Sequence, residues 1–67
     1  MSVYPVLEQK INEREINISV IAFSLKISDD EFKGKLNGTE SFYFDEALTI
    51  RDYFFPDVTL QELFNRT

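Results

Sequence analysis

The absence of both cysteine and histidine is the feature that most constrains this chain of 67 residues. Without cysteine there is no disulfide framework, no thiolate nucleophile and no zinc–thiolate site to stabilise so small a fold. Without histidine, the commonest general base and the commonest metal ligand are missing too. A core of apolar side chains, rich in its seven phenylalanines and three tyrosines, therefore has to hold the chain together.

The same composition argues against catalysis and against bound cofactors. Two glycines are too few for a phosphate-cradling loop of the P-loop or dinucleotide type. We therefore expect no enzyme, no catalytic residue, no metal site and no cofactor. The longest apolar run is Val20–Phe23, so we expect no membrane span, and the first residues predict no signal peptide. The lack of cysteine fits a cytoplasmic protein.

Helix signals, and no strand-like alternation, recur along the chain. Pro5 suits the first turn of a helix in which Leu7 and Ile11 lie one turn apart. Asn17 is a good N-cap for a second helix. Its apolar stripe comprises Ile18, Ile21, Ala22 and Leu25. The β-branched residues of this segment would also suit a strand, but the 3.6-residue spacing favours a helix.

Capping signals place the remaining helices. Residues 28–31, Ser-Asp-Asp-Glu, form a capping box, and Asn37-Gly38 suits the left-handed end of the helix that follows. A fourth helix is predicted over about residues 44–55, because Pro56 then stops it. A second capping box at residues 59–62 opens a helix over about 60–65. The sequence therefore predicts an all-α fold of five short helices.

An ordered set of residues in the middle of the chain adds a family resemblance. Residues 17–28, NISVIAFSLKIS, place the small Ala22 in mid-helix, and Phe32 and Leu36-Asn37-Gly38 follow at fixed spacing. This pattern resembles the helix-turn-helix of the Cro and phage-repressor family, the lambda-repressor-like group of the xenobiotic-response-element type. Residues 42–64 are similar to the back half of small members from Gram-positive phages. The resemblance implies one compact five-helix domain over residues 1–67, with the motif at about 17–38.

The resemblance also implies a function and a set of site residues. A phage-type transcription regulator would insert its third helix into the major groove of operator DNA, and would act as a homodimer. Recognition-helix candidates are Ser28, Asp29, Asp30, Glu31, Lys33, Gly34, Lys35 and Asn37. Phosphate-contact candidates are Asn17, Ser19, Lys26, Lys33, Lys35 and Thr39. Candidates for a dimer or partner surface are Tyr43, Tyr53, Phe54 and Phe64.

Charge keeps a second interpretation open. Twelve acidic and seven basic residues give a net charge of −5, the wrong sign for attraction to nucleic acid. The positions where family members read bases correspond to Asp29, Asp30 and Gly34, with Glu31 alongside, although acids also simply stabilise a helix N-terminus. Lys26 stands in the turn where the family commonly has glycine. The alternative is an acidic module of the same fold that binds protein, as an antirepressor, a repressor modulator or an inhibitor of a nucleic-acid-binding defence protein.

Overall fold

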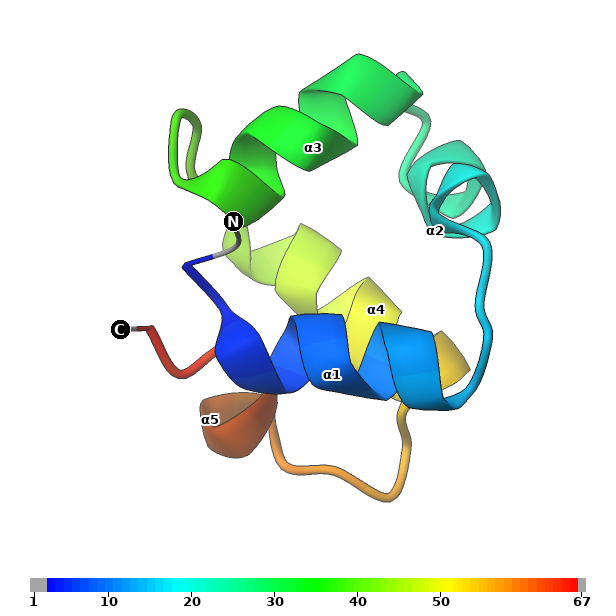
Figure 1. Ribbon diagram of the computed structural model, residues 1–67, viewed down its shortest axis with the longest axis vertical. Coiled ribbons are helices and arrows are strands. Elements are labelled where there is room, and N and C mark those ends of the chain that lie inside the picture. The colour runs from blue at the N-terminus through cyan, green and yellow to red at the C-terminus, as the bar shows by residue number, and fades with distance from the viewer. Residues whose placement is uncertain (1–2, 67) are drawn as a thin grey trace.

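All five predicted helices are present in the computed structural model, which describes residues 3–66 and contains no strand within them. The helices are α1 (Pro5–Glu13), α2 (Ile18–Ser24), α3 (Asp29–Asn37), α4 (Phe44–Phe54) and α5 (Leu60–Leu63). In Figure 1, α2 and α3 lie above α1 and α5 lies below it, while α4 runs behind α1. The described residues measure about 26 × 24 × 23 Å, and their five helices confirm the all-α prediction. None of these short helices has the length and apolarity needed to cross a membrane.

The predicted caps set the ends of the helices. The backbone N–H of Glu31 donates to Ser28 Oγ at 3.1 Å, and that of Glu62 donates to Thr59 Oγ1 at 3.2 Å. Gly38 ends α3 with φ +86°, the left-handed conformation that glycine adopts without strain. The last two helices end slightly earlier than predicted, α4 at Phe54 and α5 at Leu63.

The core forms where the apolar stripes of the helices meet. Its fully enclosed large side chains are Leu7, Ile21, Phe32, Ile50, Phe55 and Leu63. A cluster of rings in edge-to-face contact closes one end of this core, with centroids 5.2–5.9 Å apart. The cluster consists of Tyr4, Phe32, Phe42 and Phe64. Helix α5 packs against α1 and α4, whereas α2 packs mainly against α3, which leaves one side of the α2–α3 pair open.

An ion pair between distant segments fixes the end of α1. Arg14 donates to both carboxylate oxygens of Asp57 at 3.0 and 2.7 Å, and its guanidinium also lies 5.2 Å from the centre of the Phe55 ring. These hydrogen bonds from Arg14 hold the pKa of Asp57 below its ordinary value. The pair ties the end of α1 to the loop between α4 and α5.

Candidate functional site

The α2–α3 pair is built from local hydrogen bonds that the sequence encodes. Asn17 Oδ1 accepts from the backbone N–H of Ser19 at 2.9 Å and so starts α2. The turn after α2 passes through Lys26, whose φ of +61° is a left-handed conformation. Ser28 then starts α3. Because lysine has a Cβ, this turn carries strain that glycine would avoid.

Two buried side chains hold α2 against α3. Ala22 and Phe32 are both fully enclosed, in agreement with the positions predicted for the helix crossing and for the core. The small Ala22 lets α3 come close, and Phe32 extends to the ring of Phe42, 5.9 Å away between centroids. The crossing therefore leaves the opposite face of α3 turned to solvent.

Most of the predicted recognition residues lie on that exposed face of α3, but several are already engaged. Ser19 donates its hydroxyl proton to Asp29 Oδ2 at 2.5 Å, which links α2 to the start of α3. Ser28 is used as the cap of Glu31. A hydroxyl has one proton to donate, so Ser19 cannot also donate to a phosphate while this bond stands. Asp30 is exposed and makes no such bond.

Lys35 is buried in the protein, whereas a residue that contacts a DNA phosphate has to be exposed. Its side chain is 5% exposed, and its ammonium group lies 3.0 Å from Glu46 Oε1 and 2.9 Å from the carbonyl of Ser41. The rings of Phe42 and Tyr43 flank it at 6.0 and 4.7 Å. The prediction of Lys35 as a DNA contact is therefore wrong, because it sits one turn from Phe32 on the buried stripe of α3 and pairs with α4.

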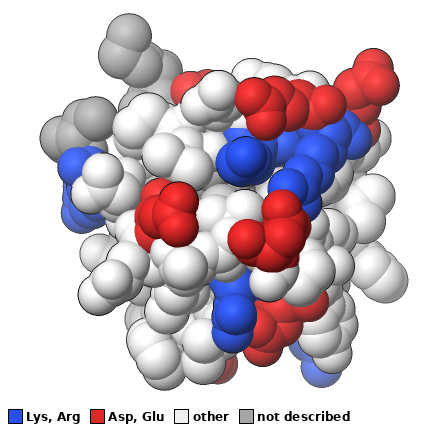
Figure 2. All heavy atoms as spheres, turned by 90° about the horizontal axis from the view of Figure 1, so that it is seen from below, with Lys and Arg blue, Asp and Glu red and all other residues white. Residues whose placement is uncertain are grey.

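The exposed charges of the α2–α3 pair favour neither DNA nor a protein as the partner. Lys26 and Lys33 are exposed, as are the polar candidates Asn37 and Thr39, while Gly34 is half-buried. The exposed acids of α3 and the loop after it are Asp29, Asp30, Glu31 and Glu40. On the face seen from below, where α5 lies in Figure 1, basic and acidic side chains are interspersed, and Figure 2 shows no area of one sign there.

The aromatic candidates divide into two groups. Tyr43 and Tyr53 are exposed, at 69% and 76%, as a contact surface requires. Phe64 instead lies in the aromatic cluster, 5.2 Å from Phe42, so it is part of the packing rather than an outer surface. Phe54 is also half-buried and lies beside Phe55.

Three exposed apolar side chains were not predicted. Phe23 is 84% exposed, Phe44 70% and Val20 53%. Val20 and Phe23 lie one turn apart on α2, off the stripe that contains Ile21 and Ala22, and this offset was readable from the sequence. Apolar side chains in such positions are typical of contact surfaces.

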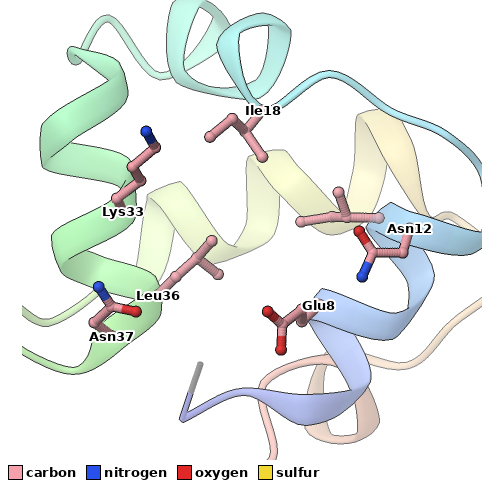
Figure 3. Close-up of a pocket in the computed structure, with 7 residues that line it drawn as sticks. Glu8, Asn12, Ile18, Lys33, Leu36 and Asn37 are labelled. Atoms are coloured by element: carbon pink, nitrogen blue, oxygen red, sulfur yellow. The ribbon is translucent and has the colours of Figure 1, made fainter. Parts of the chain in front are cut away.

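A hollow of about 290 Å³ lies between α1 and the α2–α3 pair (Figure 3). Its floor consists of Ile11, Ile18 and Leu36. Its rim is polar, with Glu8 and Asn12 on α1 facing Lys33 and Asn37 on α3. No role for Glu8 or Asn12 follows from the sequence, since nothing in the chain predicts which face of α1 lies opposite α3.

Within residues 3–66 no group of acidic side chains is placed to hold a metal ion. Comparison of the chain with protein-family models, with curated proteins and with solved structures found no match. The functional interpretation therefore depends on the geometry and charge of this chain alone.

Proposed function

We propose that the protein is a helix-turn-helix transcription regulator of the phage type and that α3 binds operator DNA in the major groove. The observation that carries this proposal is the α2–α3 pair itself. Its crossing at Ala22 and Phe32, with a left-handed turn at Lys26, leaves the outer face of α3 exposed. Docking of a second helix in this way is how helix-turn-helix proteins read base edges.

The contacts in this proposal are fewer than the sequence suggested. Lys26 and Lys33 provide the positive charges, and the Nδ2 group of Asn17 is free to donate because its Oδ1 accepts from the backbone. Asn37 and Asp30 are the exposed side chains of α3 that can reach base edges, where an acid accepts from the N4 group of cytosine. Lys35 has no part in the interface.

The salt dependence of DNA binding tests this assignment. Fluorescence anisotropy with a duplex from the protein's own promoter region should show binding that weakens with salt, with a slope of about −0.9 per phosphate neutralised. Lys26→Met and Lys33→Met should each reduce the slope by about 1, whereas Lys35→Met should leave it unchanged in the folded protein. Absence of binding at 50 mM salt, or a slope that falls with Lys35→Met, would contradict the proposal.

We infer that the protein forms a homodimer, because helix-turn-helix regulators bind the two half-sites of an operator with two copies of the domain. Tyr53, near the end of α4, is the aromatic candidate best placed to support it, because it is the most exposed of the four and, unlike Tyr43, does not lie against Lys35. Sedimentation equilibrium over a range of concentrations should show a dimer that Tyr53→Ser weakens. A monomer at every concentration would contradict this inference.

One observation favours the second candidate function, a protein-binding module with an acidic α3. With Lys35 paired to Glu46, the three exposed acids in the first turn of α3, Asp29, Asp30 and Glu31, outnumber Lys33, the one exposed lysine of that helix. Together with the net charge of −5, these acids would steer the protein to a basic partner surface. Such a partner would be a repressor or a nucleic-acid-binding protein.

Asp30→Gln separates the two functions, because Asp30 alone of the three makes no hydrogen bond that the substitution would break. A DNA-binding regulator that reads a base through Asp30 should lose about 1–3 kcal/mol of affinity for its operator duplex. An acidic module should associate more slowly with a basic partner, while the exposed control Glu15→Gln changes neither rate. An operator affinity that Asp30→Gln leaves unchanged would contradict the base contact.

A further inference from the structure

The hollow between α1 and α3 carries unpaired charges of opposite sign on its two walls. Glu8 extends from α1 toward α3, and Lys33 lies on the α3 side (Figure 3). Among the described residues, neither the Glu8 nor the Lys33 side chain forms an ion pair or a hydrogen bond. Both charged groups are therefore available to a ligand. The wall residues Asn12 and Asn37 add one amide to each side.

The floor between these walls is apolar and largely preformed. Ile11 is 5% exposed and belongs to the core, and the half-buried Ile18 and Leu36 point into the hollow from α2 and α3. An apolar floor with a few convergent polar groups is the usual form of a small-molecule site. A volume of about 290 Å³ limits the occupant to a small molecule.

We propose that this hollow binds a small molecule with a short apolar chain, an amine at one end and a carboxylate at the other. The amine pairs with Glu8, the carboxylate pairs with Lys33, and the chain covers Ile18 and Leu36. A ligand with one charge alone leaves the opposite wall unpaired and therefore binds more weakly.

The site has a regulatory consequence, which rests on the proposed function. Lys33 and Asn37 line the hollow and are also the α3 residues proposed to contact DNA. An occupant that engages Lys33 therefore competes with DNA for the same ammonium group. Ligand binding would release the regulator from its operator.

A probe series of stated chemistry tests the site in the protein alone. We expect 6-aminohexanoate, followed by amide chemical shifts in NMR, to bind about fivefold more tightly than hexanoate or hexylamine. The largest shifts should fall at Ile18 and Leu36. Equal affinity for the three probes, or shifts confined to other residues, would overturn the proposal.

Two variants test which residue binds the amine and which binds the carboxylate of the ligand. Glu8→Gln should remove the advantage of 6-aminohexanoate over hexanoate, and Lys33→Met its advantage over hexylamine. The exposed controls Glu15→Gln and Lys26→Met should remove neither, and an equal loss in the controls would overturn the site. Because these titrations contain no DNA, their failure is distinct from a failure of DNA binding. Competition is then measured by adding 6-aminohexanoate to the protein–duplex complex.

Discussion

Removing the buried ammonium of Lys35 is the most informative single perturbation of this fold. In Lys35→Met the Glu46 carboxylate loses its partner at 3.0 Å while remaining 88% buried, since its side chain is 12% exposed. Breaking a buried pair by removing one partner costs about 3–5 kcal/mol. Glu46 keeps the hydrogen bond from the Tyr43 backbone N–H at 2.9 Å, so we expect a loss near the lower limit, about 3 kcal/mol.

Urea denaturation followed by circular dichroism measures this loss, and a second variant assigns it. In Lys35→Met/Glu46→Gln the neutral amide oxygen still accepts from Tyr43, and no charge is left unpaired. We therefore expect the double variant to recover most of the stability that Lys35→Met loses. A cost below about 1 kcal/mol for Lys35→Met, or a double variant no more stable than the single one, would refute the buried-pair assignment.

Three further variants test the backbone and the pH response. Lys26→Gly should stabilise the fold by about 0.5–1 kcal/mol in thermal unfolding, because it relieves a positive φ at an exposed position; a destabilised variant would contradict this. Gly34→Ala should add about 0.5–1 kcal/mol of helix propensity, provided that the flexible Glu40 carboxylate, 3.1 Å from the new Cβ, moves aside. Asp57→Asn should flatten the loss of stability in acid. The folded pKa of Asp57 lies below its unfolded value, so its stabilisation is present above about pH 4 and is lost as pH falls through the folded pKa. An unchanged acid profile would show that the pair with Arg14 contributes nothing.

Local signals explain why so much of the helix pattern was predictable. The caps at Asn17, Ser28 and Thr59 act within three residues of themselves, and each starts a helix as the sequence indicates. The left-handed end at Gly38 is equally local. Helix ends without such a signal were less well predicted: α5 was expected to reach residue 65 but ends at Leu63.

Features that depend on distant partners were not predictable in the same way. Lys35 lies on the buried stripe of α3, where an unpaired ammonium group would be destabilising. The ion pair with Glu46 offsets that cost, and it depends on where α4 lies. The hollow likewise needs α1 to face α3, a relation that the spacing within either helix does not contain. The exposure of Phe23 depends on which helices cover α2, and among the described helices α3 alone packs closely on it.

If the protein binds DNA as proposed, the burial of Lys35 limits the positive charge available for that contact. Had all three lysines of the α2–α3 region faced solvent, they would have balanced the three acids in the first turn of α3. The burial of Lys35 leaves Lys26 and Lys33 exposed, and Lys33 also lines the hollow whose opposite wall carries Glu8. Electrostatic attraction to phosphate is therefore weak, and any specific binding has to come from base contacts by Asp30 and Asn37 or from a second copy of the chain. Under the proposed function, stability and DNA affinity therefore oppose each other at Lys35, since returning its ammonium group to the surface would require breaking its pair with Glu46.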